Sequence, residues 1–505
     1  MTRAPSLLFL ALLVGHSLHA QAPGPLDGAE ETITASDIQS RIEILAHDSM
    51  LGRDTPSPGL ERAAAYVVEE FRRLGLRPAG EGGTYVQRFG VSRWTVDTAA
   101  SSLELSAGGA RTTVAFGADV RVIGGAVSGR PIGGGAVLVA GPLTPSATRD
   151  PRLRDRIVLL APDFERPLPF DLGDRVDEIA ATARAVILLS NRDTSLFSRR
   201  IGTSLEPRLT PDFRDADGGA PVVELRESAL GGVAPAAALD LARLRALDST
   251  AIREVPGLRA ELRLARRYLQ RAAAPNLVAV LEGRDPGLRP EHVAISAHLD
   301  HVGVRPGTPD SVFNGADDNA SGVAGLLELA EAFTRRDARL ARSLLFLVPS
   351  GEEKGLWGSA YYVRHPTVPL GDIVADLNLD LIGRNWADSV IVTGPEMSTL
   401  GETLRRVTAA HPQLRMAPVT DRWPEERIFY RSDHYNFAMK GVPVLFFTSG
   451  THADYHQPSD AADRIDSEKT SRLVRLVFHL GAAVANAPGR PRWTPGSYER
   501  LVEER

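Results

Sequence analysis

The sequence predicts an α/β fold with a mostly parallel central sheet flanked by helices, and an inserted α+β domain. From about residue 275, apolar strand-like segments alternate with amphipathic helical segments, which is typical of a sheet buried between helices. Between about residues 95 and 260, short β-rich runs alternate with turns rich in Gly, Pro and Asp, which indicates a separate small domain. A chain of 505 residues has room for both.

The predicted helices and strands of the main domain come in two parts of the chain. The first part contains helical patterns over residues 35–76, with Ser36 as an N-cap and Gly75 as a C-cap. In the second part we expect helices at about 320–335, 356–364, 397–410 and 468–486. The strands expected there are NLVAVLEG, HVAISAHL, RSLLFLVPS, IVADLNLDL, SVIVTG and PVLFFTS.

The inserted domain has its own short elements. Its strands are GGAVLVAG, RIVLLAP, RAVILLSN and APVVELRE, its helix is DEIAATARA, and the segment RRYLQRAAAP has the composition of a linker. The expected domain limits are 1–22 for a signal peptide, 30–94 and 270–488 for the main domain, 95–262 for the inserted domain, and 489–505 for a C-terminal tail.

The first residues have the pattern of an export signal. Arg3 supplies the positive charge, Leu7 to Gly15 the apolar stretch, and Ala20-Gln21-Ala22 a small-x-small cleavage pattern. The apolar run is shorter than the roughly 18 residues that a membrane-spanning helix needs. We therefore expect an exported protein, periplasmic or secreted, without stable membrane insertion.

Composition excludes several kinds of function. A formal net charge of −5 over 505 residues argues against a nucleic-acid-binding protein, which would carry a basic surplus. The chain has no cysteine, so disulfides, thiolate zinc sites and cysteine nucleophiles are absent. Any metal ion must be held by His, Asp and Glu side chains.

Acidic and imidazole side chains stand where the predicted strands end. Because the carboxyl ends of parallel strands meet at one edge of a sheet, these side chains should converge there. Each of them alone has an ordinary structural explanation, such as a helix cap for Asp317-Asp318 or a core histidine for His298. Their joint placement favours a site. The residues are His298, Asp300, Asp317, Asp318, Glu352, Glu353, Asp380, Tyr455 and His456.

Such a cluster of carboxylates at a buried edge is repulsive unless cations neutralise it. Imidazoles and carboxylates without thiolates suit zinc or a similar divalent ion, with cobalt or manganese as substitutes. One carboxylate can bridge two ions about 3.5–4 Å apart, and Asp317 is the candidate. Small residues around it, Gly315, Ala316 and Ala320, would let the backbone approach the ions.

At these motifs the sequence resembles a known family, the clan MH di-zinc exopeptidases, in particular the aminopeptidase S and aminopeptidase Y type. The similarity covers about residues 290–465, and LAHDSMLGRDTPSPG resembles the family's opening. RDRIVLLAPDF and APVVELRE in the inserted domain resemble a protease-associated domain, although ATARAVILL lacks its usual glycine. The motifs of the main domain are AHLDHVG, NGADDNASG, VPSGEEKGLWGS, NLDLIGR, RSDHYNF, GVPVLFFTSG and DYHQPSD.

The resemblance implies a site with two zinc ions per chain. One zinc would be bound by His298, Asp380 and a bridging Asp317. The other would be bound by Asp317, Glu353 and His456. The family often has a cis peptide bond after its bridging aspartate, which would join Asp317 to Asp318.

The resemblance also implies roles for residues that do not bind metal. Glu352 would be the general base, and Tyr455 would help to stabilise the oxyanion. Asp300 would orient His298, and Arg431 would lie near the bound substrate.

The resemblance and the acidic site together predict an aminopeptidase acting on peptide or protein N-termini. An acidic ring would attract a free α-ammonium group, which favours the N-terminal end. Two alternatives stay open: a carboxypeptidase or dipeptidase on the same scaffold, and a receptor-like relative without catalysis. The sequence lacks the H-E-x-x-H and G-x-S-x-G patterns of zincins and serine hydrolases. The oligomeric state is not visible in the sequence.

Overall fold

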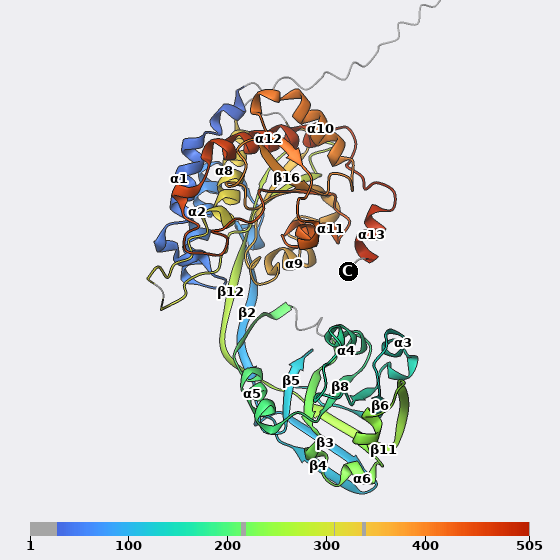
Figure 1. Cartoon of the computed structure of the whole chain (residues 1–505). Coiled ribbons are helices and arrows are strands. Elements are labelled where there is room, and N and C mark those ends of the chain that lie inside the picture. The colour runs from blue at the N-terminus through green and yellow to red at the C-terminus, as the bar shows by residue number, and fades with distance from the viewer. Residues whose placement is uncertain (1–27, 214–218, 308, 336–339, 504–505) are drawn as a thin grey trace, which may run out of the picture. The chain divides into compact units, whose positions relative to one another are not determined.

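The computed structural model describes residues 28–213, 219–307, 309–335 and 340–503 (Figure 1). The predicted signal peptide, residues 1–22, lies outside the described residues. The chain forms two compact units: unit 1 contains the described residues up to Val86 and from Leu277 onward, and unit 2 contains Gln87–Asn276. Unit 2 is therefore inserted into the sequence of unit 1.

The unit boundaries fall outside the limits expected for the inserted domain. Two long strands explain the difference: β2 (Val86–Val96) and β12 (Arg266–Leu281) both continue across the expected limits. The segment RRYLQRAAAP, which was expected to be a linker, belongs to β12, and this strand continues across the boundary between the two units. Residues 267–271 of β12 are all exposed, so they lack the apolar pattern by which a strand is recognised.

Unit 1 is built on a mostly parallel sheet, which confirms the predicted fold class. The strand order is β17-β16-β18-β15-β13-β14-β12, and β13, β14, β15 and β18 are parallel to their neighbours among these four. β12 pairs antiparallel with β14 and with the short β1, and β16 pairs antiparallel with β18. The bounds are β1 Arg77–Pro78, β13 His292–Ser296, β14 Ser343–Val348, β15 Ile373–Leu379, β16 Ser389–Thr393, β17 Ala417–Val419 and β18 Val444–Thr448.

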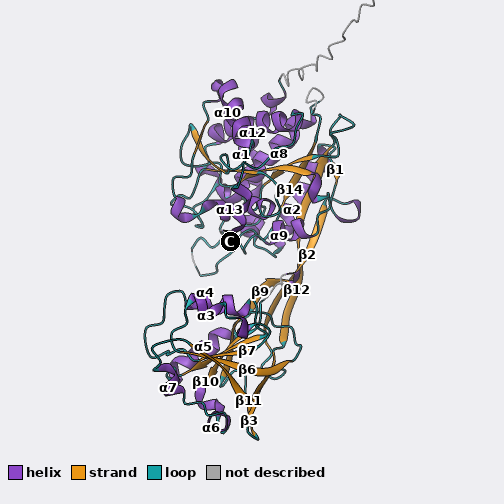
Figure 2. Cartoon of the chain, turned by 90° about the vertical axis from the view of Figure 1, so that its right-hand side faces the viewer, coloured by secondary structure: helices purple, strands orange, loops and turns teal. Residues whose placement is uncertain are grey.

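Helices cover both faces of this sheet because alternate side chains of each buried strand point to opposite faces. Val293 and Ile295 of β13 join a core with α1, α2, α8, α10 and α12, whereas Ala294 joins a core with α9, α11 and α13 (Figure 2). The bounds are α1 Ala35–Leu45, α2 Pro58–Arg73, α8 Gly322–Thr334, α9 Trp357–Arg364, α10 Leu400–Ala410, α11 His434–Ala438, α12 Ser467–Asn486 and α13 Ser497–Glu503.

Helix ends and the C-terminal tail show local differences from the sequence prediction. The N-cap of α1 is Thr34, whose side chain accepts a hydrogen bond from the Asp37 N–H, so the prediction of Ser36 was wrong. The described part of the C-terminal tail contains α13, and Trp493 Nε1 donates to the Gly441 carbonyl at 2.8 Å.

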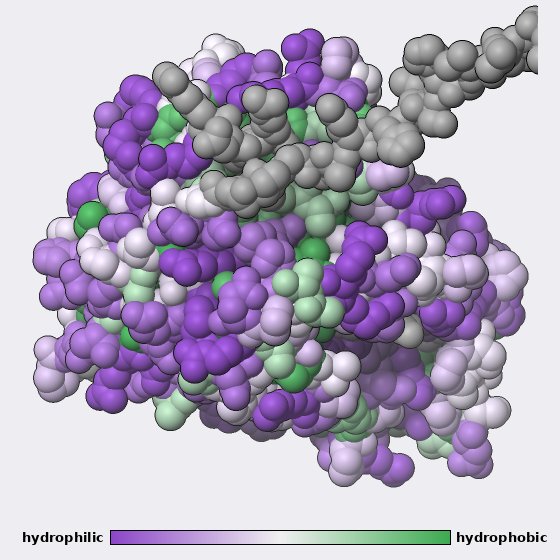
Figure 3. Space-filling model, turned by 90° about the horizontal axis from the view of Figure 1, so that it is seen from above, coloured by the Kyte–Doolittle hydropathy of each residue, from purple (hydrophilic) through white to green (hydrophobic). Residues whose placement is uncertain are grey.

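The helices of the described residues were compared with the length and hydropathy of a membrane span. None of the helices in the described part of the chain is long and apolar enough to cross a membrane. On the face shown in Figure 3, hydrophilic side chains predominate and hydrophobic ones lie in small scattered groups.

Unit 2 is an α+β unit with its own sheet, in the order β4-β3-β11-β6-β7-β8-β10-β5. Its four predicted strands correspond to β6, β7, β8 and β10, and β9 (Arg208–Pro211) pairs with β2. Its likeness to a protease-associated domain stays a prediction. The other bounds are β3 Ser102–Ala107, β4 Ala110–Val114, β5 Val120–Gly124, β6 Ile132–Ala140, β7 Ile157–Leu160, β8 Ala185–Ser190, β10 Val222–Arg226, β11 Ala251–Arg263, α3 Pro145–Thr148, α4 Leu172–Ala180, α5 Thr194–Ser204, α6 Val233–Ala236 and α7 Leu241–Arg245.

Candidate metal centre

Four neighbouring parallel strands of unit 1 end at one edge of the sheet, and polar side chains gather there. β13 leads to two histidines and an aspartate, β14 to two adjacent glutamates, β15 to one aspartate, and β18 to a loop with a tyrosine and a histidine. The turn before α8 adds another aspartate. The gathered residues are His298, Asp300, His301, Asp318, Glu352, Glu353, Asp380, Tyr455 and His456.

The first group suited to a metal ion contains His298, Asp318 and Asp380. His298 Nε2 lies 3.2 Å from Asp380 Oδ1 and 3.5 Å from Asp318 Oδ1. All three side chains are buried. The imidazole nitrogen and two carboxylates therefore converge on one point.

The second group contains His301, Asp318, Glu353 and His456. His456 Nε2 lies 3.1 Å from both Asp318 Oδ2 and Glu353 Oε2. His301 Nδ1 lies 2.9 Å from Glu353 Oε1 and 3.7 Å from Asp318 Oδ2. The two oxygens of Asp318 thus face the two groups, Oδ1 the first and Oδ2 the second.

This geometry corrects the prediction that Asp317 lies between the two groups. Asp317 Oδ1 instead accepts hydrogen bonds from the Gly383 N–H at 2.6 Å and the Ser321 hydroxyl at 3.1 Å. Its Oδ2 lies 3.2 Å from His452 Nε2, away from the two groups. Spacing along the sequence cannot tell which of two adjacent carboxylates faces the site. The cis peptide bond also lies one residue later than expected, between Asp318 and Asn319.

His301 is a site residue that the sequence interpretation missed. It is fully buried, and its ring meets the His456 ring edge to face, with 5.5 Å between centroids. The signal was present in the motif AHLDHVG, whose second histidine follows Asp300 directly. The His-x-Asp spacing indicated a metal ligand at the first histidine of the motif and gave no such indication for the second.

Glu352 stands beside the first group without joining it. Its Oε2 lies 4.0 Å from His298 Nε2, and its main-chain N–H donates to Asp300 Oδ1 at 3.1 Å. Burial raises the pKa of Glu352 well above its ordinary value, and the neighbouring charges of Asp380 and Glu353 add to this rise. A largely buried carboxylate with raised basicity next to a candidate metal site can accept a proton.

Asp300 contacts His298 mainly through its backbone. His298 Nδ1 lies 3.1 Å from the Asp300 carbonyl oxygen but 3.8 Å from the carboxylate Oδ1. Burial raises the pKa of Asp300 to about 6. The carbonyl fixes the ring so that Nε2 faces Asp380, and the carboxylate holds the turn that carries Glu352.

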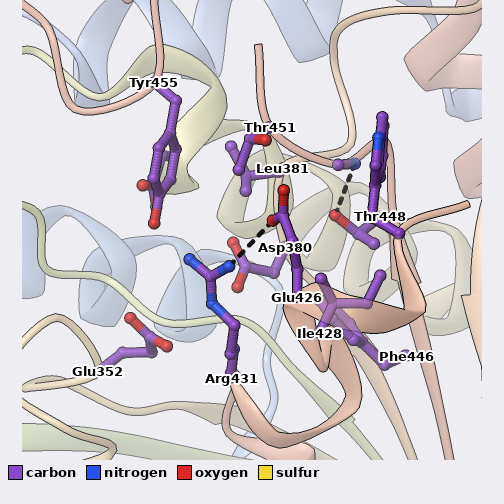
Figure 4. A pocket seen from close by; sticks show the side chains of 13 residues that line it. Glu352, Asp380, Leu381, Glu426, Ile428, Arg431, Phe446, Thr448, Thr451 and Tyr455 are labelled. Atoms are coloured by element: carbon purple, nitrogen blue, oxygen red, sulfur yellow. Dashed lines mark hydrogen bonds and ion pairs between the residues drawn. The ribbon is translucent and has the colours of Figure 1, made fainter. Parts of the chain in front are cut away.

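A pocket opens beside the cluster (Figure 4). Tyr455 lines it, with its ring stacked on His456 at 3.9 Å between centroids, and burial raises its pKa. Arg431 also lines the pocket and forms an ion pair with Glu426 at 3.2 Å. The apolar part of the lining comes from Leu381, Trp423, Ile428 and Phe446.

The donor set fits divalent metal ions. Burial alone would lower the pKa values of both His298 and His456, but the carboxylates around them raise the pKa of His298 well above its ordinary value and that of His456 to about 10. Among the described residues, His456 Nε2 has no partner in hydrogen-bond geometry, although two carboxylate oxygens lie 3.1 Å away. An imidazole nitrogen and oxygens that aim at a common point are the arrangement of a metal site.

Comparison with known proteins identifies the domain that carries this cluster. Residues 276–481 match the model of peptidase family M28. The chain contains an M28 peptidase domain. The match covers the strands β13, β14, β15 and β18 and all of the cluster residues. An M28 domain is in keeping with the resemblance to aminopeptidases of clan MH that the motifs predicted.

Three relatives illustrate the range of proteins that share this M28 domain. Aminopeptidase YwaD of Bacillus subtilis is 24% identical over 308 residues, 59% of this chain and 56% of its own. A probable zinc metalloprotease of Pyricularia oryzae is 36% identical over 263 residues, 43% of this chain and 51% of its own. Human BOS complex subunit NCLN is 30% identical over 229 residues, 41% of this chain and 40% of its own. The chain thus spans only about half the length of these relatives.

Proposed function

We propose that this protein is an exported zinc-dependent aminopeptidase, which removes N-terminal residues from peptides or proteins. The observation that carries the proposal is the position of Asp318. Its two carboxylate oxygens face separate groups of ligands, and each group contains at least one histidine. This is the arrangement expected for two ions that share one bridging carboxylate.

The M28 domain residues that would hold the two ions differ in one position from the sequence prediction. His298 and Asp380 would hold the first, Glu353 and His456 the second, and Asp318 both. His301 would hold Glu353 in place or join the second set. When bound, such ions supply a polarised water with a pKa near 7 and positive charge for an oxyanion.

The chain's own residues would handle the proton and the developing charge. Glu352 takes the proton from the attacking water and passes it to the leaving amine, since its largely buried side chain lies beside the ligands, 4.0 Å from His298 Nε2, and belongs to neither group of ligands. Tyr455, which faces the same pocket, donates its hydroxyl hydrogen bond to the oxyanion. Arg431, which lines the same pocket, binds the main chain of the substrate peptide.

The preference for the N-terminal end rests on charge. The pocket wall contains the carboxylates of Asp318, Glu352, Asp380 and Glu426, and one guanidinium from Arg431. With the ions held by Asp318 and Asp380, the carboxylates of Glu352 and Glu426 remain in the wall to attract a free α-ammonium group. A carboxypeptidase would need a cationic group free to bind the substrate carboxylate, whereas Arg431 is paired with Glu426 at 3.2 Å.

The first experiment is peptide hydrolysis by the purified full chain. Unblocked, N-blocked and C-blocked peptides are incubated with the protein, with and without a chelator, and again after zinc is restored. Mass spectrometry follows the products. We expect single residues to leave from free N-termini only, and only while metal is available.

Other outcomes point to the alternatives. Shortening of C-termini, or cleavage of dipeptides alone, would keep the scaffold but replace the substrate class. Metal binding without any cleavage would favour a receptor-like protein. The relative NCLN is named as a subunit of a complex, so membership in this family alone does not establish hydrolysis.

A further inference from the structure

We propose that the segment Gly52–Thr55, which precedes the matched M28 region in the sequence, positions the metal-binding loops, with Arg53 as the central positioning residue. The inference rests on the proposed metal centre. It assigns a role to the stretch LAHDSMLGRDTPSPG, which the proposed function does not use.

Arg53 is a buried arginine whose partners are main-chain oxygens. Only 1% of the residue is exposed. Its Nε donates to the Leu299 carbonyl at 2.8 Å, and Nη1 donates to Leu45 at 2.6 Å and Asn314 at 2.7 Å. Its Nη2 donates to the Gly315 carbonyl at 2.9 Å.

Apart from that of Leu45, which ends α1, these carbonyls belong to the loops that carry the metal ligands. Leu299 directly follows His298, and Asn314 and Gly315 lead into the turn of Asp318. Nη2 also lies 3.5 Å from the carbonyl oxygen of Asp318 itself. One rigid planar group therefore fixes the distance between the loop of the first histidine and the turn of the bridging carboxylate.

The two residues that follow Arg53, Asp54 and Thr55, contact another loop of the site. Thr55 Oγ1 accepts a hydrogen bond from the Gly351 N–H at 3.1 Å, just before Glu352 and Glu353. Asp54 forms an ion pair with Lys354 at 2.8 Å, just after them. The segment thus contacts the histidine loop, the bridging turn and the glutamate loop.

The backbone of the segment is shaped for these contacts. Gly52 has φ 59°, and a Cβ there would lie 2.4 Å from the Gly303 carbonyl oxygen and 2.5 Å from that of Phe313. Arg53 adopts φ 49°, which is uncommon for a residue with a side chain. The carbonyls of Gly52 and Arg53 accept from the N–H groups of Gly303 at 3.0 Å and His301 at 3.3 Å. The segment is therefore pressed directly against the loop after β13.

The positive charge of Arg53 lies close to the carboxylates of the site. Neutral dipoles surround the guanidinium, and the nearest formal charges are the carboxylates of the metal ligands and of Asp300 and Asp460. A buried cation beside these carboxylates lowers their mutual repulsion. The same positive charge opposes the binding of a metal cation, so the support that Arg53 gives to metal binding comes from the position in which it holds the two loops. An equally buried arginine elsewhere should not give this support.

The test compares Arg53 with Arg342, a second arginine with 1% exposure that also donates to main-chain carbonyls. Arg342 lies at the opposite end of β14 from the glutamates. The full chain is prepared as wild type, Arg53→Met, Arg53→Lys and Arg342→Met. Zinc affinity is measured by competition with a chelator, and the cobalt-loaded proteins are compared by visible absorption.

We expect Arg53→Met to bind zinc about 10–100-fold more weakly and to change the cobalt spectrum. Arg53→Lys should restore part of the affinity, because an ammonium group can still donate to some of these carbonyls but lacks the planar fork. Arg342→Met should lower the melting temperature and leave the zinc affinity within about twofold. Equal affinities in wild type and Arg53→Met would overturn the inference.

A milder variant keeps the test decisive if Arg53→Met does not fold. Thr55→Val removes only the hydroxyl that receives the Gly351 N–H, and we expect weaker zinc binding and an altered cobalt spectrum. A native spectrum and affinity in this variant would contradict the inference. Wild-type protein that binds zinc but cleaves nothing would refute the proposed function alone, and wild-type protein that binds no zinc would refute both.

Discussion

At the residue scale, the adjacent acids Asp317 and Asp318 have different tasks, and one pair of variants separates them. Asp318→Asn should lose both metal ions, because the bridging carboxylate contributes to each group of ligands. Asp317→Asn should keep two ions per chain, since its carboxylate accepts from Gly383 and Ser321 instead. Elemental analysis after gel filtration measures the metal content.

The two asparagine variants also control for each other. Both replace one buried carboxylate by an amide of the same shape, so a general loss of folding would affect both. Full metal occupancy in Asp318→Asn, together with loss in Asp317→Asn, would restore the bridging role that the sequence motif first indicated for Asp317.

Glu352 offers a second prediction at this scale. Glu352→Gln removes the proton acceptor and keeps the side-chain shape, so kcat should fall about 10²–10⁴-fold while the metal content stays unchanged. Steady-state kinetics and elemental analysis on the same preparation check both parts. Near-normal turnover in this variant would assign the base to another group.

At the scale of one element, β15 contains a carboxyl group that the proposed chemistry does not use. Asp376 is fully buried in the middle of the strand, and burial raises its pKa to about 8. The Ser296 hydroxyl lies 2.8 Å from Asp376 Oδ1 and 2.9 Å from Asn378 Oδ1. The single hydroxyl proton of Ser296 can be donated to only one of these two oxygens. If Asp376 is protonated, it donates to the Ser296 oxygen, and the Ser296 hydroxyl donates to Asn378 Oδ1.

Asp376→Asn should therefore stabilise unit 1 in a pH-dependent way. In the wild type, the folded-state pKa lies above the unfolded value, so stability present below about pH 4 is lost as the pH rises towards 8. The amide does not titrate and can donate to Ser296 at every pH. We expect a gain of about 1–3 kcal/mol at pH 8 that disappears near pH 4, measured by chemical denaturation. A gain of equal size at both pH values would contradict this explanation.

The elements also show what the sequence could and could not predict. The buried strands β13, β14, β15 and β18 were recognised because a short, continuous run of apolar residues is typical of a strand covered on both faces of a parallel sheet. β17 and α11 were missed because they have only three and five residues, too few for a periodic pattern. The ends of the predicted strands indicated where the polar side chains gather. Which of Asp317 and Asp318 points toward the other ligands is decided by the turn before α8, and the direction of the His301 side chain is decided by the loop after β13. Neither conformation can be read from residue spacing.

At the scale of the whole molecule, the two units differ in whether a metal ion would contribute to their stability. Each has hydrophobic cores of its own, so each can unfold as a unit. Both candidate metal groups among the described residues belong to unit 1, and the sequence of unit 2 contains no histidine. A ligand that binds only the folded form stabilises only the unit that holds it.

Removal of metal should therefore separate the melting of the two units. We expect a chelator to lower the transition of unit 1, because it leaves the carboxylates of Asp318, Glu353 and Asp380 close together without cations, and zinc to restore it. At a free zinc concentration of about 100 times Kd, the stabilisation is about 2.7 kcal/mol. The melting temperature of unit 2 should not change.

Differential scanning calorimetry of the full chain measures both transitions. Intrinsic fluorescence assigns each transition to its unit, because unit 2 contains Trp94 and unit 1 contains Trp357, Trp386, Trp423 and Trp493. A chelator that shifts the two transitions equally would show that the units unfold together, and one that shifts neither would argue against a metal centre in unit 1.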